Sequence, residues 1–523
     1  MTFRFSVKPP LEFIPPKLNR WVVRLSYWAL PILMKVRLRP WLPAGIQTVT
    51  VQNAETLARL FHQFQAKKIR LLIAFRHVEV DDPICMGYMF SHVIPRIAKR
   101  QQLQLRDSIH SHFMYDRGMS LWAGAWLKAF FAWMGGIPVR RGARDLKAIK
   151  AARDILINGQ FPLTIAPEGA TNGHSELLSP LEPGVAQLAF WGVQDLRRQQ
   201  RNEAMIVVPV SIRYRYSKPD WSKLDRLLTE LEEDSGLSTK AGSAKPMQRS
   251  AKGSTEPDIE RYYQRLLRIG TQMLAQTERV YRRFYHVPLG DAIDVIGKRG
   301  SGGAEEQGSK GAGLRPERSA EREQGSGGVG EHLDGMEVNG AIAQHLQPLL
   351  DEMLKVGERY FGLSSEGDLP TRCRQLEEAG WQRIYRDDLK LGQADDSNGK
   401  LAQGVSAMER GFADRIAAES LLQMEHMRVV ESMVAVTGHY VKDNPSFERF
   451  AETALLLFDV MQRIKGVKNP ARPRLGWRRA CITIGTPLSA SDRWSAYEQN
   501  RRMAKDRLTD EIRRELERLI AQS

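Results

Sequence analysis

The chain has 523 residues, of which 42% are hydrophobic, and its 77 Lys and Arg residues outnumber its 61 Asp and Glu residues to give a formal charge of +16. This length is enough for two or three domains. The three cysteines, Cys85, Cys373 and Cys481, are widely separated, which argues against a disulfide framework and favours a reducing compartment.

The positive charge is concentrated at the start of the chain. Residues 1–50 hold eight basic residues against a single acidic one, Glu12, and aromatic and aliphatic residues lie between the basic ones. This mixture is typical of a segment that lies on an anionic membrane surface, so we predict a membrane-interfacial segment over residues 1–44. Nucleic-acid binding is the alternative, but we find no zinc-finger spacing, aromatic RNA-binding motif or helix-turn-helix, and we predict no nucleic-acid partner.

No segment is a convincing transmembrane helix. The most apolar one, residues 121–139, is interrupted by Lys128, so we expect a buried helix there. Proline pairs interrupt the N-terminus and no cleavage-like site follows an apolar core, so we predict no signal peptide. We therefore expect a peripheral protein at the cytoplasmic face of a membrane.

A histidine and an aspartate stand five positions apart where a short apolar run ends. The run from Leu71 to Phe75 has the composition of a strand that is buried on both faces of a sheet, which places His77 at the strand end. Asp82-Pro83 is typical of a helix start with the carboxylate at the N-cap. Across this turn Asp82 can hold one nitrogen of the imidazole, which leaves the other to take a proton from a hydroxyl.

The spacing alone is weak evidence, because about one such match is expected by chance in a chain with 11 histidines. His286 and Asp291 have the same spacing. However, His286 follows a charged aromatic stretch and precedes a glycine-rich segment, whereas His77 follows an apolar strand. We therefore predict that His77 and Asp82 are catalytic, and a plain helix cap remains the alternative for Asp82.

Two arginines follow the next short apolar run. Residues 137–139 predict a brief strand that delivers Arg140 and Arg141 to its end, ahead of a helix over residues 146–156. Guanidinium groups bind phosphate and carboxylate oxygens bidentately, so an anionic ligand is expected there. A solvated basic face is the alternative, and we favour it for the basic residues of the helix.

The strand predicted over residues 161–166 ends in small and polar residues. We expect Glu168 to orient an arginine or bind a headgroup hydroxyl, and Gly169 and Thr171 to let the backbone come close to a substrate, with a plain turn as the alternative. A further apolar strand carries Pro209, which is unusual in a central strand and indicates an edge, a bulge or a bend that lines a site.

Another histidine pair is the nearest approach to a metal-binding pattern. His110 and His112 have no companion ligands at metal spacing, so we place both at the surface and predict no metal site and no cofactor.

Past residue 217 the composition changes. Residues 233–257 and 296–338 are rich in Gly, Ser, Lys and Glu, which predicts disorder. Helical patterns lie between and after these stretches, over residues 259–284, 341–360, 375–386, 408–440 and 447–464.

The end of the chain returns to the earlier pattern, with a strand predicted over residues 480–484 and a helix over residues 494–520. We therefore predict a discontinuous catalytic domain, made of residues 45–216 and 472–523, which a helical insert of residues 217–471 interrupts.

Four of these short stretches lie within residues 71–213, namely those that contain His77 and Asp82, Arg141, Glu168 and Gly169, and Pro209. In this order they resemble the lysophosphatidic acid acyltransferase (PlsC-like) family of glycerolipid acyltransferases. The blocks of that family are His-x4-Asp, a glycine block that ends in arginine, Pro-Glu-Gly, and an apolar strand that contains proline. The resemblance implies that His77 is the general base and that Asp82 orients it. It also implies that the acceptor phosphate is held by Gly135, Arg141, Glu168 and Gly169, and that Pro209 lines the site.

The sequence departs from the family pattern at two places. Arg76 stands where asparagine commonly precedes the histidine, and the third block continues Gly169-Ala-Thr-Asn in place of Gly-Thr-Arg-Ser. The second change removes one expected phosphate contact, for which Arg76 and Arg140 are the candidate replacements.

We therefore predict an α/β fold, with a sheet of the glycerolipid acyltransferase type and flanking helices, interrupted by a largely helical insert with disordered linkers. The expected activity moves a fatty-acyl group from coenzyme A or an acyl carrier protein to the hydroxyl of lysophosphatidic acid, directly and without a metal. Glycerol 3-phosphate or another lysophospholipid is the alternative acceptor. An inactive membrane-docked scaffold is the alternative from another functional class.

Overall fold

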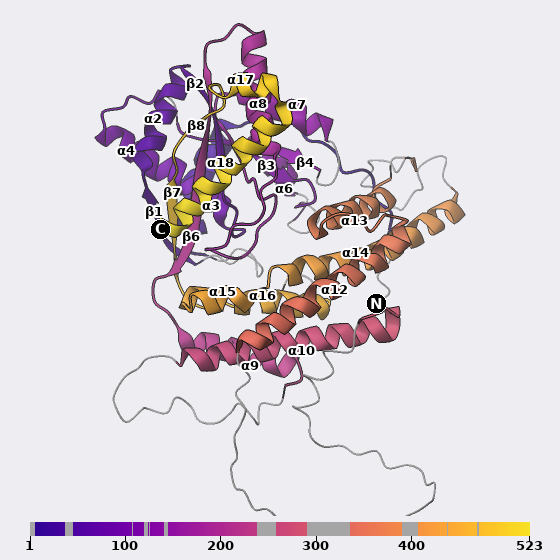
Figure 1. The fold of residues 1–523 in the computed structure, drawn as a ribbon. Coiled ribbons are helices and arrows are strands. Elements are labelled where there is room, and N and C mark those ends of the chain that lie inside the picture. Colours follow the sequence, from indigo (N-terminus) through magenta and orange to yellow (C-terminus); the bar gives the residue numbers. More distant parts are fainter. Residues whose placement is uncertain are drawn as a thin grey trace, which may run out of the picture.

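The molecule has an α/β part and a helical part (Figure 1). The computed structural model describes residues 6–36, 45–106, 108–119, 124, 126–140, 145–237, 258–289, 335–386, 388–389, 406–436, 438–467 and 470–522.

One sheet forms the centre of the α/β part. Its strands are β1 (Ile46–Gln52), β2 (Ile69–Phe75), β3 (His112–Asp116), β4 (Gly136–Val139), β5 (Leu163–Ile165), β6 (Ala204–Tyr216), β7 (Arg478–Ile484) and β8 (Leu488–Ser489). The order across the sheet is β1-β7-β6-β2-β5-β3-β4, and β8 pairs with β6 off this path. Strands β2 to β6 run in one direction, whereas β1 and β7 run in the other. The carboxyl ends of β2, β4 and β5 therefore meet at one edge of the sheet.

Helices cover both faces of this sheet. The first layer contains α2 (Ala54–Gln65), α3 (Asp82–Tyr88), η1 (Met89–Val93) and α4 (Ile94–Arg100), and the second contains α7 (Leu146–Asn158), α8 (Gly184–Arg198), α17 (Trp494–Gln499) and α18 (Arg501–Gln522). Side chains alternate along β2, so Leu71 and Ile73 pack in the first layer while Leu72 and Ala74 pack in the second. Every residue of β2 is buried, as the unbroken apolar run predicts.

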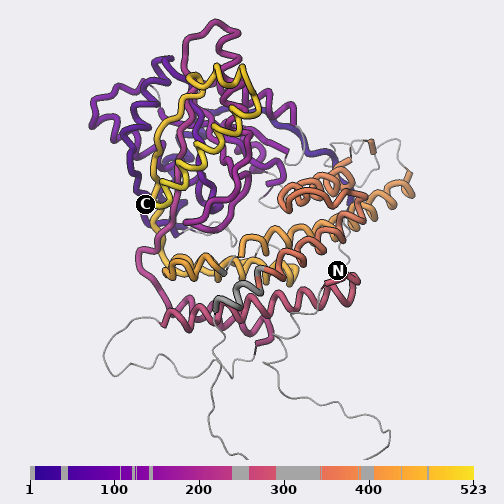
Figure 2. The backbone as a smooth tube through the Cα atoms, viewed as in Figure 1, coloured from indigo at the N-terminus to yellow at the C-terminus, as the bar shows by residue number. Residues whose placement is uncertain are grey.

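The helical part lies between β6 and β7 in the sequence. It consists of α9 (Trp221–Asp234), α10 (Ile259–Tyr285), α12 (Gly335–Phe361), α13 (Leu369–Ile384), α14 (Ala407–Val434), α15 (Gly438–Asp443) and α16 (Phe447–Ile464). These helices bury a hydrophobic core of their own. Figure 2 shows the chain leaving the sheet for these helices and then returning beside its first strands. The predictions of an α/β fold and of a helical insert are confirmed.

The predicted disordered stretches are too wide at two of their ends. Residues 233 and 234 complete α9, whose amphipathic pattern continues to its last turn, and α12 begins at Gly335 inside the second stretch. Residues 238–257 and 290–334 lie outside the described residues.

An amphipathic helix, α1 (Arg20–Leu33), packs beside the first layer. Tyr27 and Leu30 face Gly87 of α3, where an added Cβ would meet Leu30 Cδ1 at 3.2 Å. On its outer side Trp21 and Trp28 are 77% and 73% exposed. The helix is therefore anchored by one face while its aromatic face stays uncovered.

The apolar segment expected to be a buried helix gives α6 (Trp126–Trp133), which is not fully buried. Trp126 and Trp133 are exposed, because the helix lies at the surface beside the start of α1, where the Asn19 N–H donates to the Trp133 carbonyl at 2.8 Å. Among the described helices, none has both the length and the apolar character needed to cross a bilayer.

Candidate active site

His77 and Asp82 form a hydrogen-bonded pair at the carboxyl end of β2. Nδ1 of His77 lies 2.9 Å from Oδ2 of Asp82. The carboxylate is fully buried, whereas the imidazole is 23% exposed. Because a carboxylate oxygen accepts hydrogen bonds, Nδ1 is the donor of this pair, and in the neutral ring Nε2 then keeps its lone pair. In this arrangement an imidazole can take a proton from a hydroxyl.

Asp82 is held from three further donors. Its Oδ2 accepts from the N–H groups of Val78 at 2.6 Å and Glu79 at 3.0 Å, and its Oδ1 accepts from the Tyr214 hydroxyl at 2.5 Å. Burial raises the pKa of Tyr214, so its hydroxyl remains a donor. These bonds fix the position of the carboxylate that orients His77.

The helix cap expected at Asp82 is displaced by one residue. The N-cap of α3 is Asp81, and Asp82 is the first residue of the helix. The physical reason is that both oxygens of Asp82 already accept from the strand-end turn and from Tyr214, so they do not turn toward the helical N–H groups.

Glu168 joins the third block to the histidine. Its Oε1 accepts from the backbone N–H of His77 at 3.0 Å, and its Oε2 accepts from the Ser179 N–H at 2.9 Å. Burial raises the pKa of Glu168, while the nearby Arg76 guanidinium and these hydrogen bonds oppose that rise. Glu168 therefore holds the backbone of the candidate base and lies near an arginine, Arg76, and its expected contact with a headgroup hydroxyl stays a prediction.

Arg76 is fully buried and binds the loop that follows the Pro-Glu-Gly block. Its guanidinium donates to the carbonyl oxygens of His174, Ser175 and Leu177, each at 2.5 Å. These contacts tie the loop after β5 to the strand that carries His77. Arg76 is thus used inside the protein, and the expectation that it replaces the missing phosphate contact is wrong.

Side chains of the helical part complete this support. Glu452 of α16 accepts from the Ser175 N–H at 3.1 Å and from the Tyr440 hydroxyl at 2.6 Å. Glu176, in the same loop, accepts a hydrogen bond from Arg449 Nε of α16 at 2.8 Å. Burial raises the pKa of Glu452 to about 7, although its hydrogen bonds oppose the rise. The loop beside His77 is therefore held by Arg76 on one side and by α16 on the other.

Two ion pairs join the turn after His77 to the last part of the chain. Arg472 lies 2.9 Å from Glu79, and Arg478 of β7 lies 2.7 Å from Asp81. Burial raises the pKa of Asp81 to about 6, while Arg478 opposes the rise. The last part of the chain thus fixes the turn between β2 and α3.

The second block is divided between the two ends of β4. Arg140 follows the carboxyl end of this strand, is partly exposed, and pairs with Glu378 of α13 at 2.6 Å. Gly135 precedes the other end, with φ of 77°, and an added Cβ would lie 2.6 Å from His112 Nδ1. The structure therefore places Gly135 away from the edge that carries His77. Arg141 lies outside the described residues.

His110 and His112 are buried, so their predicted surface position is wrong. The Tyr27 hydroxyl lies 2.5 Å from His110 Nδ1, and His110 Nε2 donates to the Met134 carbonyl at 2.9 Å. His112 Nδ1 donates to the Gly135 carbonyl at 2.9 Å. Burial lowers the pKa of His110 to about 4, which keeps the ring neutral. Both rings are covered because β3 starts beneath α1 and α6.

The remaining predicted residues lie near the site with different exposure. Gly169 has φ of 72°, and an added Cβ would come within 2.7 Å of Glu182 Oε1, so the turn requires glycine. Thr171 is exposed in the same loop. Pro209 is buried in β6, which is a central strand, and its carbonyl accepts from the Gly485 N–H at 2.8 Å. Pro209 is tolerated there because β6 changes its partner from β8 to β7 at this position.

Several supporting residues are absent from the sequence predictions. Tyr214 belongs to the same face of β6 as Val210 and Ile212, so strand alternation alone places it toward the first helix layer. Glu452 is a single carboxylate within a long apolar stretch of α16, which is a signal for a buried polar contact. The partners of both residues are more than 100 positions away, and no local pattern identifies them.

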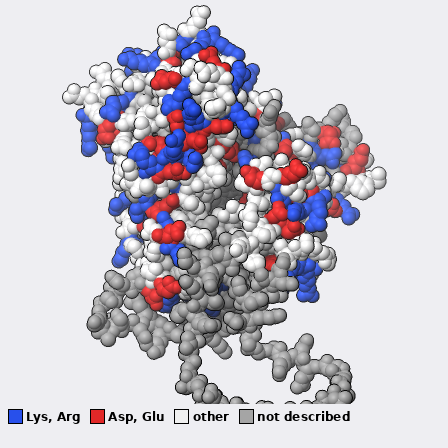
Figure 3. Space-filling view, viewed as in Figure 1, with Lys and Arg blue, Asp and Glu red and all other residues white. Residues whose placement is uncertain are grey.

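The charge on the surface is mixed. Figure 3 shows Lys and Arg interspersed with Asp and Glu over the face of the α/β part that it presents. No group of three or more His, Cys, Asp or Glu side chains that could hold a metal ion occurs among the residues the structure describes. No protein-family model matches the chain, and no curated protein matches it either.

Proposed function

We propose that the protein transfers a fatty-acyl group from a thioester to the free hydroxyl of lysophosphatidic acid, giving phosphatidic acid. The observation that carries the proposal is the hydrogen bond from His77 Nδ1 to the buried Asp82, which leaves Nε2 of a partly exposed imidazole free of that bond. The resemblance of the four sequence blocks to the PlsC-like glycerolipid acyltransferases also supports it. We propose as well that the sheet and its flanking helices have the fold of that family.

The proposed reaction is a single displacement. Nε2 of His77 takes the proton of the acceptor hydroxyl while its oxygen attacks the thioester carbonyl carbon. The tetrahedral intermediate then collapses, the C–S bond breaks, and the proton returns from Nε2 to the leaving thiolate. The ring ends neutral, and the atoms balance with the two substrates alone. Positioning by Glu168 and Asp82 supplies the rest of the expected rate.

Arg140 is the candidate to bind the phosphate of the acceptor, and Arg141 is its neighbour in the sequence. Arg140 lies at the same edge of the sheet as His77 and is partly exposed, but it already pairs with Glu378. A phosphate can compete for that guanidinium because both partners are anions with matching oxygen geometry. Glycerol 3-phosphate and other lysophospholipids carry an anionic or zwitterionic phosphate too and are the alternative acceptors.

A peripheral position on the cytoplasmic face of an anionic membrane is also proposed. Trp21, Leu25, Trp28 and Ile32 recur at helical spacing on the uncovered face of α1, and each is more than half exposed. Arg20 and Arg24 lie in the same helix, so apolar insertion and attraction to anionic lipid act together.

The test is an acyl-transfer assay with purified protein. Acyl-coenzyme A and acyl-carrier protein serve as donors, and lysophosphatidic acid, glycerol 3-phosphate and neutral lysophospholipids serve as acceptors. Phosphatidic acid formed faster from lysophosphatidic acid than from the other acceptors supports the proposal. Transfer to none of them by the wild-type protein, with liposome binding retained, favours the scaffold alternative instead.

A further inference from the structure

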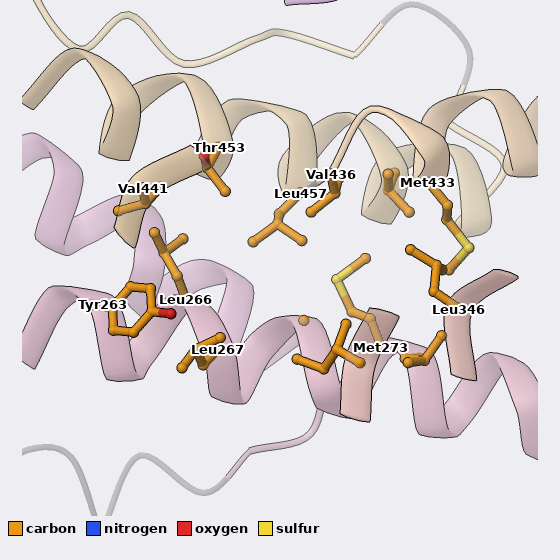
Figure 4. Close-up of a pocket in the computed structure, with 14 residues that line it drawn as sticks. Tyr263, Leu266, Leu267, Met273, Leu346, Met433, Val436, Val441, Thr453 and Leu457 are labelled. Carbon is orange, nitrogen blue, oxygen red and sulfur yellow. The ribbon is translucent and has the colours of Figure 1, made fainter. Parts of the chain in front are cut away.

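Helix α13 packs on the other helices with one side and on the α/β part with another. Leu369, Cys373, Leu376 and Ile384 recur at helical spacing and belong to the core of the helical part. That core contains an apolar cavity of about 80 Å³ among α10, α12, α14 and α16 (Figure 4), and none of the described residues that line it comes from α13. The helix therefore lies at the border of the helical part, where it meets the sheet.

Two contacts fix α13 on the α/β part. Trp381 packs against Gly118, just after β3, where an added Cβ would come within 2.8 Å of the indole ring. One helical turn or two earlier on α13, Arg374 lies 2.7 Å from Glu182, which belongs to the loop between β5 and α8. Because β3 and β5 run in the same direction, both contacts lie at the edge of the sheet that also carries His77. A third residue of α13 reaches this edge between them in sequence, and it is Glu378.

The contact between Glu378 and Arg140 is an incomplete ion pair. Glu378 Oε1 accepts from Arg140 Nη2 at 2.6 Å and from Gln382 Nε2 at 2.9 Å. Arg140 Nε and Glu378 Oε2 are both buried, and neither makes a hydrogen bond to any of the described residues. A guanidinium and a carboxylate can form two parallel hydrogen bonds, of which this pair makes one. The pair therefore leaves a buried donor and a buried acceptor unsatisfied, which weakens it.

Arg140 has a fixed backbone and an accessible side chain. Its N–H donates to Asp145 Oδ2 at 3.0 Å, and Asp145 is the N-cap of α7. The side chain of Arg140 is 33% exposed and that of Glu378 is 15% exposed, so solvent reaches the pair. Because α13 is fixed on the α/β part, it holds the carboxylate beside the guanidinium at a high effective concentration. A free anion that binds Arg140 has to displace this carboxylate first.

We propose that Glu378 is an internal competitor for the phosphate of the acceptor. The proposal rests on the proposed function, in which Arg140 binds that phosphate. A phosphate monoester carries a charge of about −1.5 to −2 at pH 7, and its oxygens can accept from Nε and Nη2 of Arg140 together. Glu378 then turns to solvent, which also hydrates its unpaired Oε2.

The competition gives Glu378 a role in specificity. A tethered carboxylate lowers the affinity of Arg140 for every anion, so a ligand that binds through its phosphate alone is held off. An acceptor whose glycerol and acyl chain make further contacts still binds. Glu378 therefore protects the site from free phosphate while the acceptor is absent.

The experiment is calorimetric titration of the full chain with inorganic phosphate and with 1-hexanoyl lysophosphatidic acid below its critical micelle concentration. Wild type is expected to bind the lipid more tightly than inorganic phosphate. Glu378→Gln keeps the shape of the side chain and removes its charge, so it is expected to bind both probes about fivefold more tightly than wild type, or better. In the acyl-transfer assay the same variant should show a lower KM for lysophosphatidic acid and an unchanged kcat.

Three further variants serve as controls. Glu182→Gln breaks the other ion pair between α13 and the α/β part, and it is expected to bind both probes as wild type does. Met273→Ala enlarges the cavity of Figure 4 and loosens the helical part, and it should not change either affinity. Arg140→Ala in the Glu378→Gln background should remove the gain in affinity.

Equal affinities of wild type and Glu378→Gln for both probes overturn the proposal, and so does a gain that survives Arg140→Ala. A gain of the same size in Glu182→Gln overturns it too, because release of α13 would then be the cause. Wild-type protein that binds inorganic phosphate as tightly as the lipid contradicts the role in specificity. None of these binding results depends on acyl transfer. A wild-type protein that transfers no acyl group contradicts the proposed function, while tighter phosphate binding by Glu378→Gln still supports the competition.

Discussion

Two histidines of the chain precede an aspartate by five positions, and the structure places them in different surroundings. His77 follows a buried strand, and its ring is fixed by a fully buried carboxylate. His286 is the C-cap of α10, with φ of 54° in the left-handed region, and its side chain is exposed. Asp291 lies outside the described residues. His77 therefore lies in a buried turn between a strand and a helix, whereas His286 lies at the exposed end of a helix.

The difference shows what a catalytic spacing requires. Asp82 is held by two backbone N–H groups and a tyrosine hydroxyl, so the imidazole of His77 has a rigid partner. A histidine that ends a helix in the left-handed conformation serves the backbone and needs no side-chain partner. The spacing acquires meaning only from the buried turn around it.

The largest expected effect is the difference in acyl-transfer rate between variants of the two histidines. His77→Ala should lower acyl transfer by about 10²- to 10⁴-fold because the general base is lost. His286→Ala should leave the rate unchanged, since that ring is exposed at a helix end. The measurement is the initial rate of phosphatidic acid formation for both variants. A comparable loss in His286→Ala would remove the assignment of His77.

A second variant pair tests the partner carboxylates. Asp82→Asn should lower the rate strongly, because an amide no longer fixes the Nδ1–H tautomer of His77. It should also lower the free energy of unfolding by about 1–3 kcal/mol, since one of the donors now meets an NH₂ group. Asp291→Asn is the control, and both are followed by initial rates and urea unfolding. Unchanged unfolding of Asp82→Asn would mean that the carboxylate is not held as described.

A third effect concerns the loop beside His77 and depends on pH. Burial raises the pKa of Glu452 from 4.5 to about 7, so the folded chain binds this proton more tightly than the unfolded chain. Stability from this group is therefore present at low pH and is lost as the pH rises from about 4.5 to 7, by up to about 3 kcal/mol.

Glu452→Gln keeps an acceptor oxygen for Ser175 and removes the titration. Urea unfolding at several pH values should show the variant gaining stability relative to wild type above pH 7, and the gain should vanish near pH 4.5. Parallel pH profiles for the two proteins would contradict this prediction.

The smallest expected effect lies on α1, outside the buried network. Replacing both Trp21 and Trp28 by alanine should weaken sedimentation with anionic liposomes several-fold, while leaving the turn around His77 intact. Binding should fall further as salt is raised, because basic residues supply part of the attraction. Equal sedimentation of variant and wild type would show that this face of the helix does not meet the membrane.

Local sequence patterns predict many of the helices and strands, but few of the long-range contacts that hold the candidate site. The apolar run of β2 and the helix over residues 447–464 are predicted closely, because burial on two faces and helical periodicity are local properties. The contacts of Arg76 are not predicted, since its partners lie about 100 residues away. His110 is missed for the same reason, because the elements that cover it are distant in sequence.

The pairing of β1 with β7 has a consequence for synthesis of the chain. Asn53, just after β1, bonds the carbonyl of Ile484, which lies 431 residues later. While the ribosome is still making the helical part, β1 has no neighbour among the described strands and the side of β6 that will pair with β7 and β8 is uncovered. The nascent chain therefore carries unpaired strand edges until β7 and β8 emerge, which makes it a candidate for protection by chaperones during translation.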